Sequence, residues 1–164
     1  MSRAEFQMLH ENVVTLGCFE VGGSLYALDV SCVREVVRWQ PITPLPKAPA
    51  LIRGVVDLRN VVIPVVDLGE ALRGECVVPG PSTRIVVVEV DGLIFGLVVD
   101  AAVDVRSVDV SSMADPPALA TQAGYEAARA VVRRPDASPI LVLSLEHLLE
   151  SVYRSAFRSE EAVA

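Results

Sequence analysis

The stretch that decides the fold is LPKAPALIRGVVDLRNVVIPVVDL, residues 45–68. It holds two apolar runs, residues 51–59 and 61–68, and only Asn60 separates them. Short runs rich in valine and isoleucine are typical of β-strands. Pro64 lies inside the second run and has no N–H to donate, so we expect it at a sheet edge or a bulge. The stretch therefore predicts two adjoining strands.

Strand signals continue on both sides of this stretch. They begin at Val13, and the pairs Gly22-Gly23 and Asp91-Gly92 each divide two apolar runs, as hairpin turns do. Helical signals are few. A short helix is expected at residues 68–72, with Asp67 as a suitable N-cap, and a C-terminal helix with one apolar face starts at Ser144. The chain is therefore predicted to be mostly β.

The two halves of the chain resemble each other. GSLYALDVSCVREV, from Gly23, aligns without a gap with GLIFGLVVDAAVDV, from Gly92. IPVVDLGEAL, from Ile63, aligns with ILVLSLEHLL, from Ile140. The alternative is a chance alignment of valine-rich strands. We favour a repeat and predict two small five-stranded β-barrel-like subdomains with short helices and a C-terminal helix, joined near residues 79–81.

The domain limits follow from the same pattern. Residues 1–12 are expected to form a flexible leader, residues 13–157 a single domain of two subdomains, and residues 158–164 a flexible C-terminal tail. The leader lacks the apolar segment of a signal peptide, and no apolar run reaches the ~18 residues of a membrane helix. Three cysteines without close spacing indicate reduced thiols. We therefore expect a cytoplasmic protein with no direct membrane insertion.

Composition argues against several functions. The 164 residues carry a formal net charge of −7, which disfavours nucleic-acid partners because phosphate binding needs clustered Lys and Arg. The two histidines, His10 and His147, have no metal-ligand spacing around them. No glycine-rich phosphate loop or nucleophile motif is present. The sequence thus predicts no catalytic residue, no metal and no cofactor.

One charged side chain in residues 45–68 suggests a binding role. Arg59 is flanked by apolar strands. An arginine in such a setting is costly to bury alone, so it lies at the surface or is paired. Arginine is also enriched among the residues that dominate protein interfaces. We therefore predict an interface role for Arg59.

The same stretch resembles the signature of CheW-like domains, which reads roughly P-x-x-P-x-x-I-x-G-[VI]-x-N-L-R-G-x-[VI]-[VI]-P-[VI]-[VI]-D-L. The matching residues are Pro46, Pro49, Ile52, Gly54, Val55, Leu58, Arg59, Pro64, Asp67 and Leu68. Upstream, the residues that resemble the family's first hairpin and the segment after it are Phe19, Tyr26, Val33, Glu35 and Val36. Downstream, GLVVDAAVDV and ILVLSLEHLL resemble its second half. The resemblance covers nearly the whole chain.

The resemblance implies a fold and a function. CheW-like domains have two β-barrel subdomains and act as non-enzymatic adaptors in bacterial chemosensory arrays. They couple methyl-accepting chemotaxis receptors to a CheA-type histidine kinase, whose regulatory domain has the same fold. The kinase binds barrel to barrel, and the receptor tip hairpin lies in the groove between subdomains. Other CheW-like domains are further possible partners, and the chain would reach the membrane arrays only through proteins. The length leaves no room for a kinase core or receiver domain, which implies a stand-alone coupling protein.

The resemblance also implies binding residues. Arg59 matches an arginine implicated in array coupling, and Glu35 matches an acid near the same surface. Val33, Val36 and Gly54 match positions linked to receptor contact. We expect Arg59 and Glu35 to pair across an apolar groove with a polar rim.

Two residues depart from the signature. Asp57 replaces the usual Asn, and Asn60 replaces the usual Gly. Asn is the non-glycine residue that best tolerates the left-handed conformation, so Asn60 is expected to preserve the turn. Both residues stay in the candidate binding site, where they bear on partner choice.

Three readings of the function remain open at this point. The leading one is the receptor–kinase adaptor. A variant of it is an adaptor for a divergent chemosensory system that controls surface motility, pili or another output. The third, of a different class, is a small β-barrel ligand-binding protein or enzyme, which would need a deep polar pocket with converging titratable groups.

Overall fold

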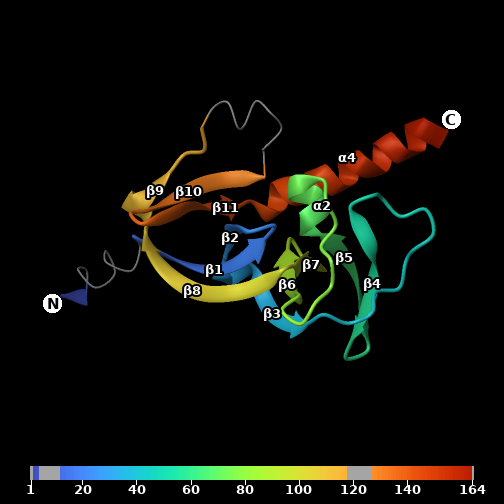
Figure 1. Cartoon of the computed structure of the whole chain (residues 1–164), viewed down its shortest axis with the longest axis horizontal. Coiled ribbons are helices and arrows are strands. Elements are labelled where there is room, and N and C mark those ends of the chain that lie inside the picture. The colour runs from blue at the N-terminus through green and yellow to red at the C-terminus, as the bar shows by residue number, and fades with distance from the viewer. Residues whose placement is uncertain (1, 4–11, 118–126, 164) are drawn as a thin grey trace.

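The structure is a computed structural model, in which residues 2–3, 12–117 and 127–163 are described, with the side chains of the last helix through Arg154. The predicted leader, residues 1–12, lies almost entirely outside the described residues. The fold is mostly β, as predicted, with two sheets and few helices (Figure 1).

Sheet A has six strands in the order β8-β1-β2-β11-β10-β9. They are β1 (Val13–Val21), β2 (Ser24–Asp29), β8 (Ala101–Asp109), β9 (Met113–Ala114), β10 (Ala128–Arg134) and β11 (Ala137–Leu143). Sheet B has five strands in the order β3-β6-β7-β5-β4. They are β3 (Val33–Arg38), β4 (Ile52–Leu58), β5 (Val61–Asp67), β6 (Arg84–Val90) and β7 (Leu93–Val99). The helical segments are η1 (Val30–Cys32), α2 (Leu68–Arg73), η2 (Val110–Ser112) and α4 (Leu145–Val163).

Among the hairpins with two-residue turns, those at Gly22-Gly23, Arg59-Asn60 and Asp91-Gly92 have a left-handed backbone. All six turn residues have positive φ, which is the type I′ geometry that suits the twist of paired strands. The turns at the two glycine-containing pairs were predicted from sequence. Helix α2 starts where Asp67 caps the backbone N–H of Glu70, as the sequence predicts for this position.

The internal repeat is confirmed by topology and register. The order β8-β1-β2-β11-β10 in sheet A corresponds to β3-β6-β7-β5-β4 in sheet B. In β1–β2, Val21 lies opposite Ser24, and in β6–β7, 69 residues later, Val90 lies opposite Leu93. The parallel pairs β2–β11 and β5–β7 also match, and both sheets therefore have the same construction.

Residues 79–81 lie between the two repeats, after α2 and before β6, but the sheets do not coincide with the two halves of the sequence. Strands β3 and β8 are exchanged: β3 follows β2 along the chain but pairs with β6 in sheet B, and β8 pairs with β1 in sheet A. Sheet A also has a sixth strand, the two-residue β9, where five were predicted. Helix α4 runs to Val163 and so includes most of residues 158–164, which we predicted as a tail.

The core joins the two sheets. A central apolar cluster takes residues from both sheets and from both longer helices, among them Phe19, Tyr26, Val88, Phe95 and Leu148. Of two smaller apolar clusters, one packs against sheet A and the other against sheet B. Burial of this aliphatic surface is the main stabilising contribution, and it explains why a valine-rich chain with few aromatics folds here.

Pro64 lies on β5, an inner strand, and the β4–β5 register is regular at Pro64, so the prediction of a sheet edge or a bulge is wrong. Val55, opposite Pro64, exchanges both backbone hydrogen bonds with Thr43 rather than with β5. Pro64 therefore directs its nitrogen away from β4, toward β7. The β5–β7 ladder begins only at Val65, so no N–H is required at Pro64.

Candidate protein-binding site

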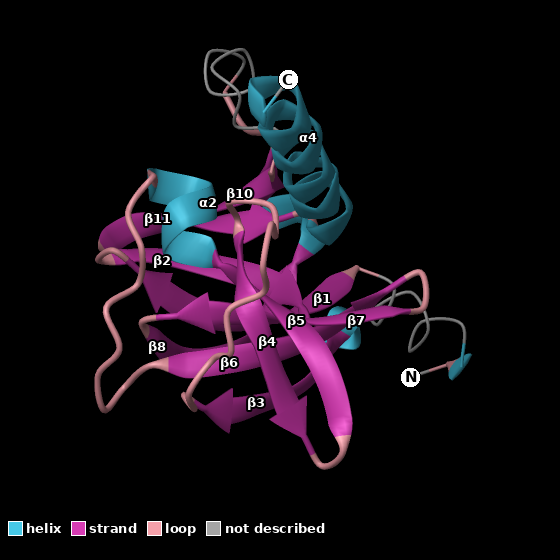
Figure 2. Ribbon diagram, turned by 90° about the vertical axis from the view of Figure 1, so that its right-hand side faces the viewer, coloured by secondary structure: helices cyan, strands magenta, loops and turns pink. Residues whose placement is uncertain are grey.

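Arg59 lies at the tip of the β4–β5 hairpin, at the end remote from α2 and α4 (Figure 2). Its guanidinium donates a hydrogen bond to the Glu35 carboxylate on β3, so the predicted pair is present. Strands β3 and β4 are the two edges of sheet B. The ion pair therefore bridges the two edges of the sheet. The Arg59 side chain is 78% exposed and remains accessible to a partner.

A shallow pocket of about 270 Å³ lies beside this pair. Its apolar wall includes Leu58, Val61 and Ile63, and Arg34 completes the charged rim through an ion pair with Glu89. The hydrogen bond to Glu35 raises the pKa of Arg59, so this arginine is a permanent positive charge. The arrangement is an exposed ionic contact on an apolar support, which suits binding to another protein.

The turn that carries Arg59 depends on the two residues that depart from the signature. Arg59 and Asn60 have φ of 49° and 69°, so the predicted left-handed conformation of Asn60 is confirmed. The Asp57 carboxylate accepts a hydrogen bond from the Asn60 backbone N–H at 2.9 Å. Sequence reasoning marked Asp57 only as a departure and missed this contact.

A second candidate surface is an apolar groove of about 200 Å³ between β3 and β8. Val33 and Val36 line it from β3, and Val103 and Val105 line it from β8. Val36 is 47% exposed and Val105 66%, which is high for valine. These two valines are equivalent in the repeat, since Val36 pairs with Val86 on β6 and Val105 with Gly17 on β1.

The groove and the ion pair lie on different sides of β3. The prediction that Arg59 and Glu35 pair is confirmed, but they do not face each other across the apolar groove, because neither lines it. Sequence reasoning also missed the β8 valines. Their signal was the alternation AVDV, which puts valine on both sides of a charged residue in a strand that proves to be an edge.

Gly54 lies apart from both surfaces. It is buried, with φ of 153°, and a Cβ there would be 2.2 Å from the carbonyl oxygen of Thr43. The segment that contains Thr43 pairs with Val55 and covers the free edge of β4. Gly54 thus allows this close packing, and contact with a partner at Gly54 stays a prediction.

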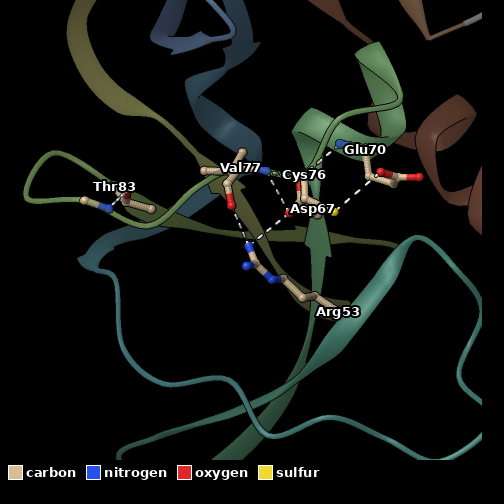
Figure 3. A network of polar contacts seen from close by, with 7 residues as sticks. Arg53, Asp67, Glu70, Cys76, Val77 and Thr83 are labelled. Carbon is tan, nitrogen blue, oxygen red and sulfur yellow. Dashed lines mark hydrogen bonds and ion pairs between the residues drawn. The ribbon is translucent and has the colours of Figure 1, made fainter.

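The other arginine of residues 45–68, Arg53, makes its contacts inside the fold (Figure 3). It donates to the Asp67 carboxylate and to the Val77 carbonyl oxygen, each at 3.0 Å. Asp67 is 2% exposed and also accepts the backbone N–H groups of Glu70 and Val77. The network fixes the segment after α2 to sheet B, and it leaves Arg59 as the arginine of this stretch that faces outward.

The described residues contain no group of three or more His, Cys, Asp or Glu side chains that could hold a metal ion. No described helix is both long enough and apolar enough to cross a membrane.

Two strand-exchanged sheets with a charged rim and a separate apolar groove define a binding scaffold. The family model of the CheW-like domain matches residues 15–153, and the chain belongs to this family. The chemotaxis protein CheW of Rhizobium meliloti is 32% identical over 84% of the chain and 88% of its own length. Protein FrzA of Myxococcus xanthus is 31% identical over 85% and 87% of the two chains.

A solved structure agrees with these relatives. The scaffolding protein TtCheW from Thermoanaerobacter tengcongensis has a TM-score of 0.73 and 31% identity, covering 82% of this chain and 86% of its own. The family, the relatives and this structure place the chain among the coupling adaptors of chemosensory signalling.

Proposed function

We propose that this adaptor joins the cytoplasmic tip of methyl-accepting chemotaxis receptors to the regulatory domain of a CheA-type histidine kinase, without catalysis of its own. The observation that carries the proposal is the presence of two exposed surfaces of different character, the Arg59–Glu35 rim and the β3–β8 groove. An adaptor has to bind two partners at once, and two separate surfaces permit this.

The groove suits a helical hairpin. Its exposed valines come from two edge strands and offer an apolar channel, and apolar grooves bind the apolar face of a helix. We therefore assign Val33 and Val36 to receptor contact, and extend this surface to Val103 and Val105.

The rim suits a folded domain. Arg59 is exposed, permanently charged and supported by apolar residues, and arginines in such positions often dominate interfaces. We assign this surface, with Glu35 and the Asp57–Asn60 turn, to the kinase regulatory domain or to another CheW-like domain. The adaptor would then work in the cytoplasm and reach membrane arrays only through these partners.

The test is quantitative binding of the purified chain to a kinase regulatory domain and, separately, to a receptor tip fragment. Arg59→Ala is expected to weaken binding to the kinase by about tenfold, since truncating a central interface residue costs roughly 1–2 kcal/mol. Arg59→Glu should weaken it further. Thermal unfolding should stay nearly unchanged, because the side chain is exposed.

The matched control is Arg133→Ala, which removes an exposed arginine from β10 in sheet A. Val36→Asp should reduce binding to the receptor fragment and leave binding to the kinase intact. Wild-type affinity of both Arg59 variants for both partners would contradict the assignment of the rim.

A divergent output remains a second candidate, supported by FrzA among the relatives at an identity similar to that of the CheW proteins. Asp57 and Asn60 are the positions in the rim where this chain departs from the signature. Co-purification with kinases from flagellar and from other chemosensory systems would separate the two.

A further inference from the structure

The β4–β5 turn differs from the two related hairpin turns in its residues. All three are type I′ turns, but the turns of β1–β2 and β6–β7 end in glycine, at Gly23 and Gly92. The β4–β5 turn has side chains at both positions, Arg59 and Asn60. Left-handed φ is unfavourable for residues with a Cβ, and more so for Arg than for Asn. This turn therefore carries more backbone strain than the other two, since both of its residues have a Cβ, whereas the β6–β7 turn has one such residue, Asp91, and the β1–β2 turn has none.

Asp57 supports this turn. Its Oδ1 accepts the Asn60 backbone N–H at 2.9 Å, three residues along the chain. The side chain is exposed, and no ion pair of Asp57 is found among the described residues. Its contact with the turn is thus what the structure shows this carboxylate to do.

The supported turn determines where Arg59 can reach. From the tip of the β4–β5 hairpin the guanidinium crosses to Glu35 on β3, although β3 and β4 are at opposite edges of sheet B. A change of φ at either turn residue would turn the Arg59 side chain away from that edge. Holding the turn therefore holds the charge in place.

We propose that Asp57 is a positioning residue for Arg59: by holding the Asn60 N–H it fixes the turn from which Arg59 meets both Glu35 and the partner. This inference rests on the proposed function of the rim as a kinase-binding surface. It explains how a chain without the usual glycine at position 60 keeps a working turn, and it makes the Asp57–Asn60 pair a determinant of affinity.

The test is a double-mutant cycle with a purified CheA-type regulatory domain as the probe. Asp57→Ala is expected to weaken binding about three- to tenfold, and Asp57→Asn, which keeps an oxygen at the same reach, should restore most of it. In an Arg59→Ala background, Asp57→Ala should have little further effect. The matched control, Asp91→Ala, changes an exposed aspartate in the β6–β7 turn and should leave binding unchanged.

A second measurement needs no partner. Asp57→Ala should speed hydrogen exchange at the Asn60 amide and shift the Arg59 Nε–Hε signal in NMR spectra, and Asp57→Asn should reverse both. Equal losses from Asp57→Ala in the wild-type and Arg59→Ala backgrounds would overturn the positioning role. So would an Arg59 signal that does not respond to Asp57→Ala. Undiminished binding by Arg59→Ala, with the NMR changes present, would instead overturn the kinase-binding role of the rim.

Discussion

At the scale of single residues, three charges within one short stretch have three different tasks. Arg53 donates hydrogen bonds to Asp67 and the Val77 carbonyl inside the fold, and the Asp57 carboxylate accepts the Asn60 backbone N–H of the turn. Arg59 is exposed and pairs with Glu35. Their order along the chain does not reveal this division. It depends on which strand face each residue occupies and on a loop that returns 24 residues later to present Val77.

Asp67 is expected to be important for stability. Asp67→Ala removes the acceptor for two backbone N–H groups and leaves the Arg53 guanidinium without its carboxylate. Breaking a buried pair in this way costs about 3 kcal/mol of unfolding free energy, measurable by urea denaturation. Asp109→Ala, which removes an exposed cap from η2, should cost less than about 1 kcal/mol. If Asp67→Ala also lost less than about 1 kcal/mol of unfolding free energy, the Arg53–Asp67 network would contribute little to stability.

Cys18 gives the protein a dependence on alkaline pH. Burial, with a smaller effect of the neighbouring Asp104 carboxylate, raises the pKa of this thiol from 9.0 to about 11. The neutral thiol therefore contributes stability that is fully present below pH 9 and is lost as the pH rises through 11. The loss is on the order of 2–3 kcal/mol. Urea unfolding at pH 8 to 11 should show a shallower decline in Cys18→Val, and identical declines would refute the assignment.

At the scale of elements, the sequence was most informative where a local rule decides the outcome. The hairpin turns, the Asp67 cap and the repeat were predicted because each rests on residues close in the chain or on a regular pattern. The family resemblance implied an apolar groove with Val33 and Val36, but the β8 wall of this groove could not be predicted, because β3 and β8 come together only through exchange between the sheets. For the same reason the valines of β8 did not stand out as site residues.

At the edge of β4, a single glycine determines whether the neighbouring segment can pair with the strand. Gly54 lets the segment at Thr43 pair with Val55 and cover this edge. Gly54→Ala would place a methyl group against the Thr43 carbonyl in a backbone conformation that disfavours a Cβ, at a cost of about 3 kcal/mol. Gly80→Ala is the matched control, since a Cβ there meets nothing within 4 Å. Thermal denaturation should give a lower melting temperature for Gly54→Ala than for Gly80→Ala. Equal melting temperatures would show that the Thr43 segment can move away from the added methyl group at little cost in stability.

At the scale of the whole molecule, the repeat and the exchange have opposite consequences. The repeat gives each sheet the same strand order, so sequence alignment of the halves predicts the architecture. The exchange ties the sheets together, since β3 and β8 each complete the sheet that their own hairpin does not form. The break at residues 79–81 looks like a domain boundary only because the sequence does not show which sheet each strand joins.

This interlocking predicts that neither half folds alone. Residues 1–79 would keep two separate hairpins, β1–β2 and β4–β5, and residues 82–164 would keep mainly β6–β7 and β10–β11. Isolated two-stranded hairpins are at best marginally stable in water, and the central cluster draws on both fragments. Each fragment should therefore show poor dispersion in NMR spectra, and mixing them should restore the native spectrum. The intact chain should unfold in one calorimetric transition. Cooperative unfolding of either fragment by itself would mean that its hairpins form a core without the exchanged strand, and the two sheets would then be separable domains.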